Sequence, residues 1–230
     1  MEKQRQFDKE LDNLKKKLVH RAALTETMID SGLAVLVQRD AAPAAKVRKY
    51  EQEVNRLEIE IDENALTLLA TQQPVARDLR FIVAATKING ELERIGDLCI
   101  NITQNAETLL RQPPLKPLID IPHMADLARK MVRDCLDAFI AGDALVAQAV
   151  IMADDRVDAL KDQVLRELLT YMLSDPQTIE RGLALILISR HLERIGDHAV
   201  NIAEDVIYMT QGRDVRHPKT PKQRPQESEL

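Results

Sequence analysis

A six-residue segment occurs twice in this sequence, beginning at Leu92 and again at Leu192, and reads Leu-Glu-Arg-Ile-Gly-Asp both times. The dipeptide Asn-Ile follows each copy, at Asn101 and Asn201. A short identity can arise by chance, but both copies lie at the same place in two matching orders of helical segments, which is the pattern of an internal repeat. The chain is therefore predicted to contain two related units in tandem.

Helical periodicity extends over most of the chain, because apolar residues recur at spacings of three and four. Glycine is scarce, with 7 residues, and aromatic residues make up only 3%, which favours helices. The periodic segments are interrupted at five places that are rich in proline or in turn-forming residues. These interruptions lie at residues 40–43, 72–74, 112–122, 141–143 and 174–176. The interruptions divide the chain into six predicted helices, in two sets of three. The third helix of the first set ends near Arg111, and that of the second set ends near Met209.

The predicted fold is all-α, with two tandem, pseudo-symmetric three-helix bundles. The first bundle covers residues 1–111 and the second residues 123–211. Four prolines make residues 112–122 a linker through which no helix is expected to run. Residues 212–230 contain too few apolar side chains to offset chain entropy, so this tail is expected to be disordered.

Charge and hydropathy exclude several classes of function. A net charge of -5 gives no general attraction to nucleic acid. The most apolar run, residues 182–189, is far shorter than the roughly 20 residues that span a bilayer, and no signal peptide is recognisable at the N-terminus. Cys99 and Cys135 lack the short spacings of zinc or redox sites. We therefore expect a cytoplasmic protein with reduced, buried cysteines that reaches membranes only through partners.

Carboxylates repeat on the outer face of the third helix of each unit. Glu93 and Asp97 are spaced by four residues, as are Glu193 and Asp197, so each pair lies on one side of its helix. That side points away from the apolar stripe that contains Ile95 or Ile195. Two carboxylates one turn apart repel each other, and a divalent or trivalent cation between them removes that repulsion. The pairs are therefore candidate ligands for hard metal ions.

The second helix of each unit carries further oxygen ligands beside its apolar stripe. These are Glu51 and Asn55 in the first unit and Asp154 and Asp158 in the second. If the second and third helices of a unit are neighbours, four such side chains converge. The alternative is that these acids are ordinary solvated charges.

Other residues near the repeats have open interpretations. Gly96 and Gly196 each cost about 1 kcal/mol relative to alanine in a helix, which indicates either close approach to the backbone or helix packing. Arg94 and Arg194 are most simply surface ion-pair partners, although they also suit an acidic partner or phosphate. His191 and His198 are expected to be surface residues.

The doubled segment and the three-helix layout, together with residues 51–55 and 154–158, resemble the PhoU family, the accessory regulators of bacterial phosphate-specific transport. The resemblance extends from about Phe7 to His217. It implies metal ions on the bundle surface, iron or zinc in the first place, with manganese or magnesium as alternatives. The ligands implied by position are Glu51, Glu93, Asp97, Asp154, Asp158, Glu193 and Asp197. Asn55 stands where the second unit has Asp158, and its neutral amide is a weaker ligand.

The resemblance also implies a function, which helical periodicity does not show. A PhoU-like protein represses phosphate uptake and the phosphate-starvation response when phosphate is plentiful. It bridges the ATPase subunit of the phosphate transporter and the phosphate-sensing histidine kinase, often as a homodimer, and it is not an enzyme. Two alternatives remain: a carboxylate-bridged metal enzyme, which normally draws Glu-x-x-His ligands into the bundle core, and a helical scaffold without metal.

Overall fold

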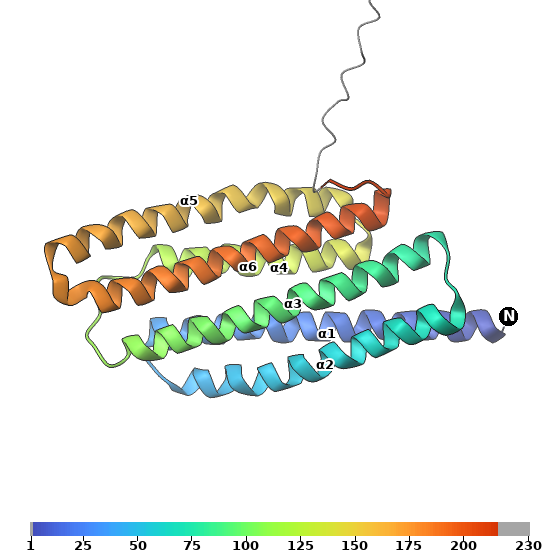
Figure 1. The fold of residues 1–230 in the computed structure, drawn as a ribbon, viewed down its shortest axis with the longest axis horizontal. Helices are drawn as coiled ribbons and strands as arrows, with labels where there is room; N and C mark the ends of the chain where they lie inside the picture. The colour runs from blue at the N-terminus through green and yellow to red at the C-terminus, as the bar shows by residue number, and fades with distance from the viewer. Residues whose placement is uncertain (1, 216–230) are drawn as a thin grey trace, which may run out of the picture.

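Six long helices form the described part of the protein, which is residues 2–215 of a computed structural model, with the side chains of residues 2–5 left aside. The all-α prediction is confirmed, and no strand occurs within this range. The first unit contains three helices and the second unit three more, with one short 3-10 turn, η1, before the last helix (Figure 1). Their bounds are α1 Glu2–Gln38, α2 Ala42–Gln72, α3 Ala76–Leu109, α4 Asp120–Ala141, α5 Ala144–Ser174, η1 Pro176–Thr178 and α6 Ile179–Gln211.

The turns form where the sequence supplies a glycine that can adopt the turn conformation or a side chain that can cap a helix end. Gly142 and Gly212 adopt the left-handed conformation, both with φ of 67°, and end α4 and α6. Asp143 caps α5 by accepting hydrogen bonds from the amides of Leu145 and Val146, at 2.8 and 3.2 Å. After the end of α1, the guanidinium of Arg39 donates to the carbonyls of Leu109 and Leu110 at the C-terminal end of α3, which satisfies acceptors that a helix end leaves open.

The proline-rich linker lies two to three residues earlier in the chain than predicted. Residues 110–119 are not helical, but α4 begins at Asp120 and therefore includes Pro122. Proline is tolerated in the first turn because an amide at that position has no partner within the helix. Of the predicted disordered tail, residues 216–230 lie outside the described residues, while residues 212–215 follow α6 without helical structure.

The two units share a long seam made by α3 and α6, which run side by side in opposite directions (Figure 1). Polar contacts set the alignment of these helices: Glu91 meets His198, with 2.6 Å between Oε2 and Nδ1, and Lys87 meets Asp205 at 2.8 Å. Glu91 lies four residues before Ile95, and His198 lies three residues after Ile195. The repeated segments therefore face each other across a local two-fold axis near these two isoleucines, which are 0% exposed.

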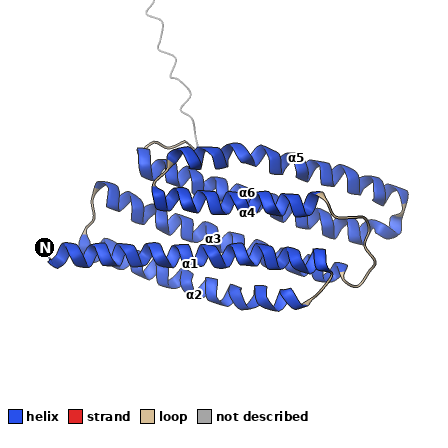
Figure 2. Cartoon of the chain, turned by 180° about the vertical axis from the view of Figure 1, so that it is seen from behind, coloured by secondary structure: helices blue, strands red, loops and turns tan. Residues whose placement is uncertain are grey.

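A second, smaller seam joins α1 to α4, which lie beside each other when the molecule is seen from behind (Figure 2). Two ion pairs cross it. The Arg133 Nε atom donates to Glu26 at 2.9 Å, and the Arg129 Nε atom lies 3.1 Å from Asp30. Buried apolar residues of both units form one cluster, so the units pack against each other through a continuous core.

Candidate metal centre

Four carboxylates converge on the outer face of the second unit. Asp154 and Asp158 lie on α5, and Glu193 and Asp197 lie on the neighbouring α6. Their mutual repulsion shows in Asp154, where partial burial and then the negative charges of Asp197, Asp158 and Glu193 raise the pKa from 3.8 to about 6. Burial and the charges of Glu193 and Asp158 also raise the pKa of Asp197. We name these four residues the second-unit cluster.

The side chain of Asp154 approaches the backbone of α6 closely at Gly196. A Cβ atom added at Gly196 lies only 3.1 Å from the Asp154 Oδ1 atom, closer than most real Cβ contacts. At Gly96, in contrast, the nearest neighbour of an added Cβ is a methyl group of Val54 at 3.7 Å, an ordinary van der Waals distance. The close approach of Asp154 therefore explains the glycine of the second unit, while the contacts around Gly96 give no steric reason for the glycine of the first.

A lysine stands inside the second-unit cluster. The Lys161 Nζ atom donates to Glu193 Oε1 at 3.1 Å and to Asp158 Oδ1 at 3.3 Å, and these hydrogen bonds raise the pKa of Lys161. Within residues 2–215, no three His, Cys, Asp or Glu side chains already lie close enough to ligate a single ion. Binding of one ion by three of these carboxylates therefore requires side-chain rotation.

The raised pKa of Asp154 predicts an effect of pH on stability. A carboxyl group with a raised folded-state pKa favours folding at low pH, and this contribution is lost as the pH rises through the folded-state value, about 6 here. Asp154→Asn removes the charge at every pH. In metal-free protein it should raise the free energy of unfolding near pH 7 and have a much smaller effect near pH 4. Urea denaturation followed by circular dichroism at both values measures this.

The matched control for this experiment is Asp126→Asn, which changes an exposed carboxylate on α4. It should leave the pH profile of the wild-type protein unchanged. Equal gains from Asp154→Asn at the two pH values would show that the pKa of Asp154 is not raised in the folded protein.

The first unit arranges its acids differently. Glu93 and Asp97 lie on the outer face of α3, Asp97 exposed and Glu93 partly so, as the helical spacing predicts. Burial, followed by the charge of Asp97, raises the pKa of Glu93, and Glu58 on α2 contributes to the same rise. Glu51 lies on α2 and is partly exposed, but no contact from it to Glu93 or Asp97 is recorded in the described part of the chain. In this unit Glu58, which the helical spacing did not indicate, is the α2 carboxylate next to Glu93.

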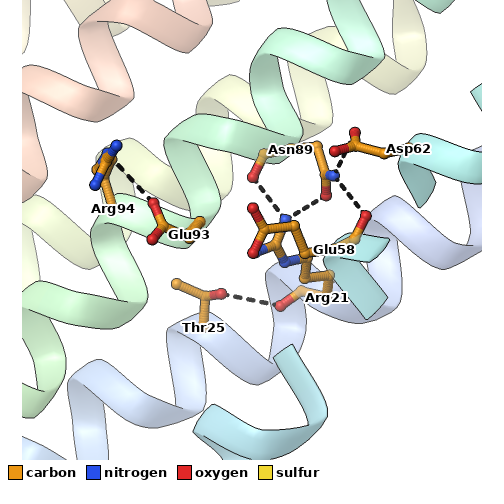
Figure 3. Close-up of polar contacts among 7 residues, drawn as sticks. All are labelled: Arg21, Thr25, Glu58, Asp62, Asn89, Glu93 and Arg94. Carbon is orange, nitrogen blue, oxygen red and sulfur yellow. Dashed lines mark hydrogen bonds and ion pairs between the residues drawn. The ribbon is translucent and has the colours of Figure 1, made fainter. Parts of the chain in front are cut away.

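Glu58 belongs to a buried polar network that links the three helices of the first unit (Figure 3). At its centre is Arg21 on α1, which is 0% exposed. The guanidinium donates to the backbone oxygen of Asn89 at 2.6 Å, to the Asn89 side-chain oxygen, and to Glu58 Oε2 at 3.2 Å. The Asn89 amide in turn donates to the Glu58 backbone oxygen at 3.0 Å and to Asp62 at 2.9 Å. Burial lowers the pKa of Arg21, and the Glu58 charge opposes that change.

Both histidines near the second motif are less exposed than predicted. His198 is largely buried in the α3–α6 seam by its contact with Glu91. His191 is half-buried, its Nδ1 atom has no hydrogen-bond partner among the described residues, and burial lowers its pKa. The two-fold relation explains the difference: the position that corresponds to His198 in the first unit is Leu98, which has no polar group to offer His191.

Other predicted features agree with the structure. Arg94 forms the expected surface ion pair, with its Nε atom 3.3 Å from Glu93. Cys99 and Cys135 are fully buried free thiols, and burial raises the pKa of both. No helix of residues 2–215 combines the length and the apolar character needed to cross a bilayer.

The sequence and the fold are similar to those of known proteins. The PhoU domain matches residues 18–106 and 121–206, one copy in each unit. The phosphate-specific transport system accessory protein PhoU homolog of Pseudomonas putida is 40% identical over 92% of this chain and 83% of its own length. The homolog from Aquifex aeolicus is 40% identical over 91% of this chain and 95% of its own length.

Solved structures give the same result. The crystal structure of PhoU from Pseudomonas aeruginosa has a TM-score of 0.87 and 38% identity, and covers 90% of this chain and 100% of that one. The phosphate transport system regulatory protein PhoU from Streptococcus pneumoniae has a TM-score of 0.83 and 25% identity, over 92% of this chain and 100% of that one. The domain matches, the sequence relatives and the shared fold together show that this chain belongs to the PhoU family.

Proposed function

We propose that this protein is a cytoplasmic negative regulator of phosphate uptake and of the phosphate-starvation response. The observation that carries the proposal is the similarity over both units to relatives named as accessory proteins of the phosphate-specific transport system. In this role the protein is an adaptor between the ATPase subunit of the phosphate transporter and the phosphate-sensing histidine kinase. Phosphate supply would change which partner it holds.

The adaptor binds metal ions at its outer carboxylates in this proposal. The second-unit cluster fits a hard cation, because it offers four carboxylates, and burial followed by the charges of the other three raises the pKa of Asp154. In the first unit, Glu93 and Asp97 with Glu51 or Glu58 form a smaller set. A bound ion would neutralise these charges and tie α5 to α6 in one unit, or α2 to α3 in the other. Iron and zinc are the first candidates, followed by manganese and magnesium.

An adaptor role without catalysis agrees with the place of these acids. The carboxylates lie on the outer faces of the helices, whereas helical-bundle metal enzymes direct Glu-x-x-His ligands into the core. The third residue after Glu193 is Gly196, where such an enzyme would have histidine. Oxygen consumption by the iron-loaded protein would instead support the enzymatic alternative.

A surface for protein partners is available beside the second-unit cluster. Large apolar side chains on the second half of α5 and the first half of α6 are exposed, which is common at protein contact sites. They are Leu165, Leu169, Leu173, Ile179, Leu183 and Leu187. A homodimer, the transporter ATPase and the kinase are the partners that we propose for this protein.

Binding to the two partners and repression of starvation genes test the function together. The chain, expressed in a bacterium that lacks its own PhoU-family protein, should restore repression of a phosphate-starvation reporter in high phosphate. It should also copurify with the transporter ATPase or the kinase. Failure to bind either one, with phosphate and metals supplied, together with no repression, would contradict the adaptor role. Elemental analysis of protein purified without chelators separates the metal-binding adaptor from a scaffold without metal.

A further inference from the structure

Lys161 places a positive charge among the carboxylates of the second-unit cluster. Its ammonium group bridges the two helices, because it bonds Glu193 on α6 at 3.1 Å and Asp158 on α5 at 3.3 Å. Both of these residues are proposed metal ligands. The ammonium group therefore takes up acceptor oxygens that a metal ion would need, and it neutralises part of the charge that would attract the ion.

The first unit has no lysine at the corresponding place. The buried positions of α2 recur 103 residues later in α5, as in Val54 and Val157. In this alignment Glu58 of the first unit is at the position that corresponds to Lys161 of the second. The cation beside Glu58 is Arg21, 3.2 Å away, which comes from α1. Each unit thus carries one internal cation beside its acids, but the two cations come from different helices.

The two cations also differ in their freedom to move. Arg21 is 0% exposed and is held by Asn89 as well as by Glu58, so it has no route to solvent without disruption of the core. The Lys161 side chain is 27% exposed and has a flexible four-carbon stem. Lys161 also has an ion-pair partner outside the cluster. The Asp162 Oδ1 atom lies 3.7 Å from Nζ, and the Asp162 side chain is 57% exposed.

We infer that Lys161 is the resident counter-cation of the second-unit cluster, and that a metal ion binds there only by displacing this ammonium group toward Asp162 and the solvent. This inference rests on the proposed metal binding. A divalent ion and an ammonium group that share Glu193 and Asp158 would repel each other strongly at a distance of a few ångströms. Metal occupancy would therefore release a lysine at the surface of the second unit, while the first unit keeps its cation buried.

Removal of the ammonium group tests the inference through metal affinity. Chelator-stripped wild-type protein and the Lys161→Met variant are titrated with MnCl2 and with ZnCl2 by calorimetry. Lys161→Met keeps the length and apolar volume of the stem and should bind about tenfold more tightly or better. The matched control is Lys130→Met, which removes a lysine of the same unit that is paired with Asp134 on α4, and it should bind as the wild type does.

The outcomes separate this inference from the proposed metal binding. Tighter binding by Lys161→Met alone supports the inference, as does binding by this variant when the wild type shows none. Equal affinities for all three proteins overturn it and leave metal binding intact. No binding by any of them overturns both.

A measurement on the wild type covers the case in which the variant folds poorly. Acetylation of lysines by a soluble anhydride, followed by peptide mass spectrometry, reports which amines are held in contacts. Addition of the metal should increase labelling of Lys161 several-fold and leave labelling of Lys130 unchanged. Unchanged labelling of Lys161 at saturating metal would overturn the inference.

Discussion

Arg21→Ala is expected to lower the free energy of unfolding by about 3–5 kcal/mol, because a cavity in the core adds to the loss of the donor to a polar network. Arg21 is 0% exposed, so alanine leaves a cavity. It also leaves Glu58 and two oxygens of Asn89 without their donor. Urea denaturation followed by circular dichroism measures the loss.

The control is Arg56→Ala, because Arg56 is an exposed arginine whose ion pairs with Glu53 and Glu60 lie on the surface of α2. Its denaturation midpoint should stay close to that of the wild type.

The second unit suggests a variant whose stability should be intermediate between those of Arg21→Ala and the wild type. Met124 is fully buried at the position that corresponds to Arg21, so Arg21→Met should fill the space and recover part of the stability that alanine loses. An Arg21→Ala protein as stable as Arg56→Ala would contradict the role assigned to the network.

Replacement of both acid pairs is expected to abolish regulation without unfolding the protein. The variant carries Glu93→Ala, Asp97→Ala, Glu193→Ala and Asp197→Ala, and it should show no more repression of a phosphate-starvation reporter in high phosphate than a strain that lacks the protein. Under the proposed function these changes remove the metal ligands of α3 and α6. Because the side chains lie on the outer faces of α3 and α6 and the two acids of each pair repel each other, the circular dichroism spectrum and most of the stability should be retained.

The control for this variant removes the same number of acids elsewhere on the surface, at Asp12, Glu63, Asp126 and Asp137. It keeps the net charge equal to that of the test protein and should repress as the wild type does. Full repression by the test variant would mean that the acid pairs do not matter for function. Loss of repression in both variants would point to net charge instead of metal ligands.

Much of this architecture was predictable because it depends on local patterns. Helix ends follow from prolines, glycines and capping aspartates, and the outward direction of Asp97 and Asp197 follows from helical spacing. The exception was the start of α4, since Pro122 can occupy a first helical turn.

The features that were missed depend on contacts between distant segments. Arg21 occurs at a core position of α1, between Leu18 and Thr25, and a charged residue in such a stripe was the available indication of a buried network. Its partners Glu58 and Asn89 lie on two other helices, which one helical pattern does not identify. The contact between Glu91 and His198 likewise requires the alignment of α3 with α6. Lys161 was not distinguishable from an ordinary surface lysine until α5 and α6 were placed together.

The ion pairs between α1 and α4 show that matching positions of the two halves carry opposite charges. Glu26 and Asp30 correspond to Arg129 and Arg133, because Met28 and Met131 occupy matching places beside Gly96 and Gly196. A pair of first halves arranged in this way would set acid against acid, and a pair of second halves would set arginine against arginine, and like charges at this distance repel. Neither half is self-complementary at this contact, so these ion pairs favour a molecule that contains one copy of each half over a pair of identical halves.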